Sequence, residues 1–593
     1  MSVEPASKNK QLVEGNVALV QFRISDAATG TAISNAQPAA WMNLRKEGQA
    51  DAPADCMRKA ADYLSGSLLT RPTVDLNSYY VLALNDDATV SVVDPLFGFG
   101  GTKLLAMLFL KSAGEDWALT QDQSLLFVSM PDSNQVAVAD ATAWKVITNL
   151  DVGPRPTRLA LQGKLLWVAY GEQGSESGVA VVDVSELKLQ SRIALGRGKH
   201  EIAFSSDNRY ALATSRDDCL ASIIDAAKLE KIADVKTGGK LSSIAFSPRA
   251  QLFYVTDEAS GDIIAIDASR QKIVSRIKAE PGIAQIRLAP DGRFAFVANS
   301  SKNLVHILDA TTNRIIQTAD IDGGPDQITF TSNLAYVRRR ASEIVLMIPL
   351  AQIGQADKPV PVVDFPGGQL PFGKTTRPAL ADTIVQAPDA NAVLVANPAD
   401  KAIYYYKEGM AAPMGSFSNY SREPRAVMVV DRSLKETAPG IYSTVAKLNQ
   451  PGAYSVVFFL DSPRVVHCFE VEVAPREDSA RVKKSVRLAA QSLMKERTVR
   501  AGEKVRLRIK LTDADTGQPL DDLQDVVVLT FLAPGIWQKR HAAQPAGGGV
   551  YEIEFTPPQA GVYYIYVESA SAGLSMNNAY YFTLEAASAA SSR

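Results

Sequence analysis

The stretch FYVTDEASGDIIAIDA, residues 253–268, contains an apolar strand, a small polar turn, a second apolar strand and an Asp that ends it. The stretch FAFVANSSKNLVHILDA, residues 294–310, repeats this order. Between residues 79 and 408 the pattern occurs eight times, and its closing Asp recurs at Asp94, Asp140, Asp183, Asp225, Asp267 and Asp309. Self-similarity at roughly 40–45 residues, made of strands and turns, indicates a β-propeller with one blade per repeat.

Each repeated pair of strands is expected to be the central hairpin of one blade. The weakest copies are the last two, AYVRRRASEIVLMIPL and VLVANPADKAIYYYKE. The sequence therefore predicts an all-β protein with an eight-bladed propeller, and seven blades is the alternative if the first or last hairpin lies elsewhere. The eight hairpins are expected at 79–94, 125–140, 165–183, 209–225, 252–267, 294–309, 334–349 and 391–407.

Two segments outside the propeller repeat each other at two different offsets. The strand and DAxTG turn near residue 20 recur 487 residues later, whereas two tyrosine-containing strands recur 109 residues later. A β-sandwich in two copies, the first split by an insertion that holds the propeller, explains both offsets, because exposed loops tolerate insertions whose ends lie close together. The matched residues are Asp26 with Asp513, Tyr442 with Tyr551, and Tyr454 with Tyr563.

The PGAY and AGVY sequences that precede long apolar strands resemble the tyrosine corner of immunoglobulin-like sandwiches. Within the segment that leads to the propeller, CMRKAADYLSGSL looks helical or irregular. The expected domains are a split immunoglobulin-like sandwich at 11–47 and 416–474, a propeller with its leading bridge at 48–415, a linker at 475–500, and a second immunoglobulin-like sandwich at 501–586.

The composition is that of a globular protein, with 46% hydrophobic and 21% charged residues in 593. A net charge of −2 argues against a general attraction to nucleic acid or an anionic membrane. No run approaches the ~20 apolar residues that span a bilayer, so no transmembrane segment is expected. The start MSVEPASKNKQ has no apolar signal region, which leaves a cytoplasmic protein or a mature exported chain, and three cysteines do not decide between them.

The YVT-D and VAN-S strands with their closing Asp resemble the YVTN family of β-propellers, which are mostly extracytoplasmic. An eight-bladed form is also similar to the haem-carrying propeller of dissimilatory nitrite reductase and its haem-maturation relatives. That resemblance implies a periplasmic or extracellular location and makes haem a candidate cofactor with His200 as its ligand, although the adjoining KHEIAF is only a partial match. The second sandwich resembles those of bacterial periplasmic copper-handling and oxidase-associated proteins without their His and Met clusters, which implies docking or spacing.

In a propeller, the connections between blades lie on the same face as the central hairpin turns. In this sequence both sets of segments are rich in Arg and Lys, so a basic face is predicted that would bind carboxylate or phosphate. Solvated loop charges are the alternative. The candidate ligand-binding residues are Arg155, Arg158, Arg197, Lys199, His200, Lys240, Arg338, Arg339 and Arg340, with Arg216 and Lys236 nearby.

Signals for metal or catalytic chemistry are weak. His200 and Cys219 are candidate metal ligands on the fourth blade, whereas the adjacent His467 and Cys468 would point to opposite faces of a strand. Cys56 is a candidate for a disulfide or a partner contact. The sequence contains no CxxCH, GxSxG, P-loop or HExxH motif and no zinc-ligand spacing.

The function expected from these observations is that of an exported, non-enzymatic scaffold. Its propeller would bind a protein partner of an envelope or extracellular assembly, or an anionic small molecule, on the basic face. The alternative is a haem-binding or redox accessory protein that uses His200 on the same face.

Overall fold

The protein is described by a computed structural model whose described residues are 2–5, 12–45, 53–64, 72–95, 103–171, 176–339, 344–355, 359–368, 379–388, 391–410, 412–448, 450–475, 488–494, 497–513, 516–521, 523, 526–532, 537–569 and 581–588. The chain forms two compact units. The first contains Met1–Lys10, Val17–Lys447 and Tyr454–Val471, and the second contains Gln11–Asn16, Leu448–Ala453 and Glu472–Arg593.

Most of the first unit consists of four-stranded antiparallel sheets, eight of which follow one another along the described chain between residues 79 and 431. We number them sheets 1 to 8. Written from the inner strand outward, sheets 1 to 4 are β36 (Pro424–Asp431), β5 (Tyr79–Asn85), β6 (Thr89–Asp94) and β7 (Lys103–Phe109); β8 (Trp117–Leu119), β9 (Leu125–Met130), β10 (Gln135–Asp140) and β11 (Lys145–Asp151); β12 (Leu159–Gln162), β13 (Leu165–Tyr170), β14 (Gly178–Asp183) and β15 (Lys188–Ala194); and β16 (Ile202–Phe204), β17 (Tyr210–Ser215), β18 (Leu220–Asp225) and β19 (Glu230–Lys236).

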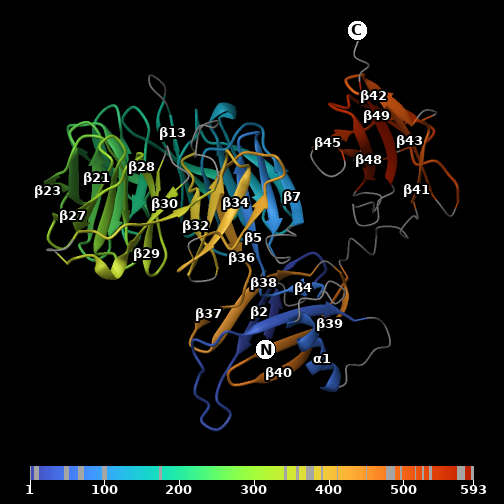
Figure 1. Cartoon of the computed structure of the whole chain (residues 1–593), viewed down its shortest axis with the longest axis horizontal. Coiled ribbons are helices and arrows are strands. Elements are labelled where there is room, and N and C mark those ends of the chain that lie inside the picture. Colours follow the sequence, from blue (N-terminus) through green and yellow to red (C-terminus); the bar gives the residue numbers. More distant parts are fainter. Residues whose placement is uncertain are drawn as a thin grey trace. The chain divides into compact units, whose positions relative to one another are not determined.

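Sheets 5 to 8 have the same order and are labelled in part in Figure 1. They are β20 (Leu241–Ser247), β21 (Leu252–Asp257), β22 (Asp262–Asp267) and β23 (Lys272–Lys278); β24 (Ile283–Leu288), β25 (Phe294–Asn299), β26 (Leu304–Asp309) and β27 (Arg314–Asp320); β28 (Pro325–Phe330), β29 (Leu334–Arg339), β30 (Ile344–Pro349) and β31 (Val363–Pro366); and β32 (Ile384–Gln386), β33 (Ala392–Asn397), β34 (Ala402–Lys407) and β35 (Gly415–Ser418). Short 3-10 turns follow β9 (Pro131–Ser133) and β30 (Leu350–Gln352).

The sheets are arranged as a β-propeller. Inner strands of consecutive sheets contact one another from β8 through β12, β16, β20, β24, β28 and β32 to β36. Each of the eight predicted hairpins is present as a paired second and third strand of one sheet. The ring closes where β36 pairs with β5, for example Val427 with Ala83, and Figure 1 shows this orange strand beside the blue ones.

The closing strand lies beyond the boundary that the sequence predicted for the propeller. Residue 415 was the expected end, but Pro424–Asp431 is the inner strand of sheet 1. Its pairing joins segments more than 330 residues apart, and a strand that completes a sheet from so far away carries no local repeat of its own. Sheet 1 therefore takes its inner strand from beyond the predicted end of the propeller.

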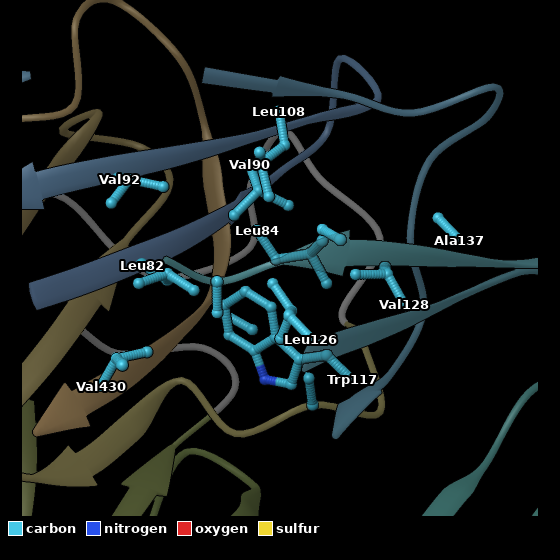
Figure 2. Packing of buried hydrophobic residues seen from close by; sticks show 14 of the residues in the cluster. Leu82, Leu84, Val90, Val92, Leu108, Trp117, Leu126, Val128, Ala137 and Val430 are labelled. Atoms are coloured by element: carbon cyan, nitrogen blue, oxygen red, sulfur yellow. The ribbon is translucent and has the colours of Figure 1, made fainter. Parts of the chain in front are cut away.

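Apolar side chains fill the spaces between neighbouring sheets, as between sheets 1 and 2. Figure 2 shows Trp117 and Leu126 of sheet 2 packed against Leu82 and Leu84 of sheet 1, and Val430 belongs to the same cluster. Burying one such Leu or Val side chain contributes about 1.5–3 kcal/mol. Because both faces of each sheet are covered by its neighbours, the central strands are largely apolar.

The Asp that closes each repeat has a structural role in the turn that follows. In sheet 3, the Asp183 side chain accepts hydrogen bonds from the backbone N–H groups of Ser185 and Glu186. Asp225 does the same with Ala227 and Lys228. This Asx-type turn satisfies two backbone donors at the start of a tight turn, which explains why the repeat ends in Asp.

Two further sheets of the first unit pack against each other. Their strand orders are β1 (Ser2–Pro5), β2 (Val17–Arg23), β38 (Ile441–Lys447) and β37 (Lys435–Ala438), and β4 (Val74–Asp75), β3 (Ala39–Leu44), β39 (Gly452–Leu460) and β40 (Val465–Val473). The ring of Phe22 lies 5.0 Å from that of Phe458 and 6.0 Å from that of Phe469, so the sheets share an apolar interface. Strands from before and after the propeller therefore belong to the same sheets.

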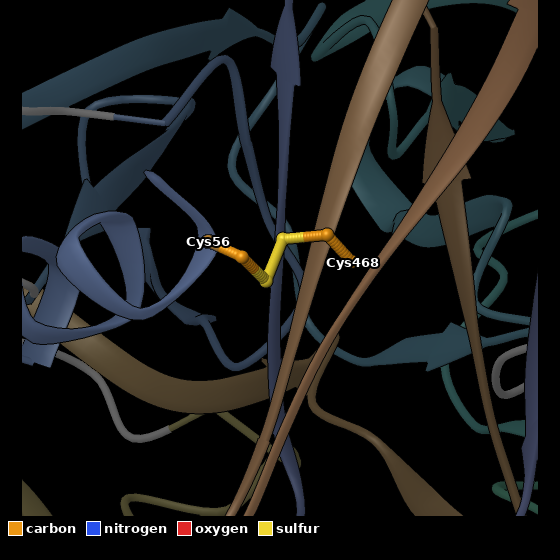
Figure 3. Close-up of a disulfide and its surroundings, with 2 residues drawn as sticks. All are labelled: Cys56 and Cys468. Carbon is orange, nitrogen blue, oxygen red and sulfur yellow. A yellow bond between two sulfur atoms is a disulfide. The ribbon is translucent and has the colours of Figure 1, made fainter. Parts of the chain in front are cut away.

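A helix before the propeller is attached to these sheets by a disulfide. The predicted helical segment is α1 (Pro53–Leu64), and its Cys56 is bonded to Cys468 of β40 across 412 residues (Figure 3). Trp41, Ala60 and Val457 form the small apolar cluster at this contact. The sequence named Cys56 as a disulfide candidate without identifying its partner.

The second unit contains two sheets with a common core that includes Leu507, Ile553 and Ile565. Their strand orders are β41 (Leu488–Ser492), β43 (Val505–Asp513), β47 (Val550–Phe555) and β46 (Gln544–Gly547), and β42 (Thr498–Arg500), β49 (Tyr581–Ala587), β48 (Gly561–Glu568), β44 (Val527–Leu532) and β45 (Trp537–Ala542). The linker predicted at 475–500 thus includes two strands, β41 and β42. These two strands are short and lie in a charged segment, so the sequence showed no strand pattern there. Pairing of β41 with β43 and of β42 with β49 stabilises them.

The tyrosines that suggested a duplication make equivalent bonds in both sandwiches. Tyr442 donates to Ile33 O (3.0 Å) and accepts from Ala36 N (2.8 Å). Tyr551 donates to Leu520 O (2.8 Å), and its hydroxyl also accepts from the backbone N–H of Leu523 (3.1 Å). In addition, the hydroxyl of Tyr563 donates to the carbonyl of Gln559, four residues earlier.

None of the helices among the described residues is long and apolar enough to cross a membrane.

Candidate ligand site in the propeller channel

A ring of mostly polar side chains surrounds one mouth of the central channel, at the start of the inner strands. The register of the inner and second strands gives one such position in each sheet, and a polar residue occupies it in sheets 2 to 8. We call these residues the channel-mouth ring; they are Asp116, Arg158, Glu201, Ser243, Gln285, Gln327 and Thr383.

The ring side chains join neighbouring sheets. The Oδ2 atom of Asp116 accepts a hydrogen bond from Leu159 N (3.0 Å), and Gln285 Oε1 accepts one from Ile328 N (2.7 Å). Gln327 Oε1 accepts one from the backbone N of Thr383 (2.7 Å). In each case a side chain of one sheet satisfies a backbone donor of the next sheet, so the ring both lines the channel and holds its wall together.

Residues 379–382, which we call the mouth segment, lie across this end of the channel. On one side, Leu380 N and Ala381 N donate to Glu115 O, and Arg158 donates to Leu380 O. On the other side, Asp382 accepts hydrogen bonds from Arg287 (2.7 Å) and Gln327 (3.1 Å). Sheets 2 and 3 lie opposite sheets 6 and 7 in the ring, so a segment that contacts both pairs must cross the channel. Asp382 O also accepts a hydrogen bond from the backbone N–H of Val427 in the neighbouring sheet 1.

A cavity of about 320 Å³ lies beside the mouth segment. Its charged lining comes from four different sheets, and its apolar lining comes mainly from β32, β36 and Trp117. Ligand pockets typically measure about 300–1,000 Å³ and combine apolar walls with a few polar groups, as this one does. The charged residues are Asp116, Arg158, Arg287 and Asp382.

Three ion-pair contacts made by two arginines set the electrostatics of the cavity. Arg158 contacts Glu201 (2.8 Å) and Asp116 (3.4 Å), whereas Arg287 contacts Asp382 (2.7 Å). Burial raises the pKa of Asp116 to about 6, although Arg158 and two backbone N–H groups favour the ionised carboxylate. The three carboxylates and two guanidiniums leave the cavity without an excess of positive charge.

The basic face predicted from the sequence is largely neutralised by carboxylates on the same face. Arg155 pairs with Asp132 (3.1 Å) and Arg197 with Asp218 (2.8 Å). Arg158 pairs with two acids as described, and Arg216 forms an ion pair with Glu258. Each of these four arginines therefore has an acidic partner.

The arginines of sheet 7 are also engaged. Arg338 is 7% exposed and makes a two-point contact with Asp326 at 2.8 and 2.7 Å, together with a bond to Thr383. Arg339 donates to the carbonyls of Ile344 and Asp322, and Arg340 lies outside the described residues. By contrast, the side chains of Lys199 and Lys240 are exposed.

Within the described residues, His200 and Cys219 are not joined by a third side chain that could hold a metal ion. His200 is 2% exposed, and its Nδ1 lies 2.6 Å from Thr214 O, so Nδ1 carries the donated proton. Burial lowers the pKa of this imidazole. Cys219 is a free, partly buried thiol, and no group of three or more metal-binding side chains occurs in the described parts of the chain.

Sequence reasoning missed the carboxylates that decide this site. Asp116 and Glu201 occupy the same repeat position as Arg158, and Asp382 directly precedes that position in sheet 8. The recurring pairs of a polar residue and an apolar one, such as Gln285–Ile286 and Gln327–Ile328, were a signal for the ring. Comparing acidic as well as basic residues at this repeat position would have identified the channel-mouth ring.

No protein-family model and no curated protein matches this sequence. Among solved structures, apo AztD from Citrobacter koseri is 14% identical, with 60% of this chain and 98% of that chain covered and a TM-score of 0.46. Dihydro-heme d1 dehydrogenase NirN in complex with DHE is 13% identical over 64% and 78%, with a TM-score of 0.47. Kuenenia stuttgartiensis hydrazine synthase is 17% identical over 50% and 96%, with a TM-score of 0.38.

Proposed function

We propose that this chain is a non-enzymatic binding protein of the periplasm or extracellular space. Its core is an eight-bladed propeller, and two immunoglobulin-like sandwiches, the first split by the propeller, serve to dock it on a larger assembly. The observation that carries the proposal is the cavity at the channel mouth, where charged side chains of four sheets converge on about 320 Å³.

Binding explains the cavity better than catalysis does. Its polar side chains are two Asp, two Arg and one Gln, without a Ser, Cys, His or Lys that could serve as a nucleophile among the described lining residues. The charged groups are held by ion pairs and by bonds to backbone groups. Such preorganised groups orient a ligand at little entropic cost.

The disulfide supports an oxidising compartment. Cys56 and Cys468 are bonded, and structural disulfides persist outside the cytosol and are rare within it. This favours the exported alternative over the cytoplasmic one.

An anionic ligand on the predicted basic face has less support than a ligand in the cavity, because the arginines of that face have acidic partners. Lys199 and Lys240 are the exposed part of the predicted basic face and are available to an acidic protein partner. The haem alternative has less support as well, since the ring of His200 is buried and does not line the cavity.

Filling the cavity tests the proposal. Val429 lines the cavity, and Val363 is an exposed valine of the outer strand of sheet 7. We expect native mass spectrometry of the full chain, incubated with an extract of small molecules from its own host, to show a bound species. That species should be lost in Val429→Trp and kept in Val363→Trp. The same bound species on both variants, or none on the wild type, would remove the cavity as the ligand site.

A further inference from the structure

We infer that the cavity takes a small zwitterion of the α-amino-acid class with an apolar side chain, its carboxylate on Arg287 and its ammonium on Asp382. This inference rests on the proposed function and names its ligand.

The first step is the bonding capacity that these two residues keep. A guanidinium has five N–H donors, and Arg287 uses one, from Nη2 to Asp382 Oδ1. Asp382 Oδ1 also accepts from Gln327, whereas its Oδ2 makes no bond to any residue in the described part of the chain. The side chains are 39% and 27% exposed and both line the cavity. One donor group and one acceptor atom therefore face the same space side by side.

The second step is charge balance. A simple anion on Arg287 would lie close to the carboxylate of Asp382, and a simple cation on Asp382 would lie close to the guanidinium. In a partly buried site an uncompensated charge is costly. A ligand that carries both charges gives each residue a partner and leaves the net charge of the site unchanged.

The third step is the shape and polarity of the rest of the cavity. Val385, Val427 and Val429 from two adjacent inner strands and the indole of Trp117 form an apolar wall. Such a wall favours an apolar side chain by about 25 cal/mol per Å² of apolar surface removed from water. A volume of about 320 Å³ is at the small end of ligand pockets, which suits a single amino acid better than a large cofactor.

The test measures the binding of leucine and of two analogues to the full chain by isothermal titration calorimetry. The analogues are 4-methylpentanoate, which lacks the ammonium, and 3-methylbutylamine, which lacks the carboxylate. We expect leucine to bind at least tenfold more tightly than either analogue. Arg287→Gln should reduce the affinity for leucine at least tenfold, and so should Asp382→Asn. The matched control is the exposed pair Lys231 and Asp234, whose variants Lys231→Gln and Asp234→Asn should leave binding unchanged.

A change of preference guards against simple loss of folding. In Asp382→Asn, 4-methylpentanoate should bind at least as tightly as leucine, since the group that recognises the ammonium is gone. Equal binding of leucine and 4-methylpentanoate to the wild type would overturn the zwitterion inference while leaving the cavity as a binding site. If valine, leucine and phenylalanine all fail to bind while another molecule is lost in Val429→Trp, the ligand class is wrong and the proposed function stands.

Discussion

Gln285 Oε1 accepts a 2.7 Å hydrogen bond from the backbone N–H of Ile328, which lies 43 residues later on the inner strand of the next sheet. Replacing Gln285 with Leu removes this acceptor and leaves a buried N–H group, since Ile328 is fully buried. We expect a loss of about 1–3 kcal/mol in the free energy of unfolding. Chemical denaturation measures it, and Gln285→Glu, which keeps an acceptor oxygen, should restore most of the loss. Equal destabilisation by both variants would contradict a role for the acceptor.

The buried ion pair of Arg338 and Asp326 should be sensitive to removal of the cation. Their side chains are 8% and 3% exposed, so Arg338→Met deprives a buried carboxylate of its main compensating charge. The expected cost is about 3–5 kcal/mol. Arg197→Met breaks an exposed ion pair with Asp218 and should cost much less than Arg338→Met, because solvent screens exposed charges. Thermal unfolding of both variants checks the contrast, and similar effects would show that burial is not the cause.

Asp116 should make stability depend on pH in the weakly acidic range. Burial raises its pKa from 3.8 to about 6 in the folded protein. Its folded pKa lies above the unfolded value, so its contribution is fully present below about pH 4 and is lost as the pH rises through 6. Asp116→Asn should remove this slope while it keeps an acceptor for Leu159 N.

The measurement is the unfolding midpoint of both proteins at several pH values from 4 to 7. As the pH rises, we expect the unfolding midpoint of the wild type to fall relative to that of Asp116→Asn. Asp207 is a control of opposite sign, because hydrogen bonds from Ser205 and Arg209 lower its pKa. Its contribution is therefore lost only below about pH 4, so Asp207→Asn should leave the slope between pH 4 and 7 unchanged. Parallel curves for wild type and Asp116→Asn would refute the prediction.

The disulfide between Cys56 and Cys468 should stabilise the contact of α1 with β40. Replacing both cysteines with Ser is expected to cost about 2–4 kcal/mol, chiefly because the unfolded chain gains freedom. Reductant should lower the thermal midpoint of the wild type to that of the double variant and leave the double variant unchanged. A reductant effect that persists in the double variant would place the sensitive group elsewhere.

Local patterns predicted the hairpins well. Strands such as Phe294–Asn299 and Leu304–Asp309 are short, apolar and separated by a polar turn, so each hairpin is determined by residues adjacent in the chain. The turn Asp at positions such as Asp309 acts within three residues of itself. For the same reason the two sandwich tyrosines, Tyr442 and Tyr551, were recognisable by their shared surroundings.

Distant partners could not be predicted in this way. The pairing of Val427 with Ala83 and the bond between Cys56 and Cys468 join segments separated by hundreds of residues, and no local rule selects such partners. The acidic partners of the basic residues could not be predicted for a related reason. The cations were visible in the sequence, but whether Arg338 faces solvent or Asp326 depends on how neighbouring strands are aligned.

The amino-acid sequence by itself determined the repeated hairpins and the all-β character of the chain, because periodic apolar residues and turn-forming Asp act over short distances. Only the tertiary structure decided where the ring closes, which charges cancel, and that residues 379–382 cross the channel beside a cavity. Those features depend on through-space contacts between remote segments, whose energies appear only when the whole ring is assembled.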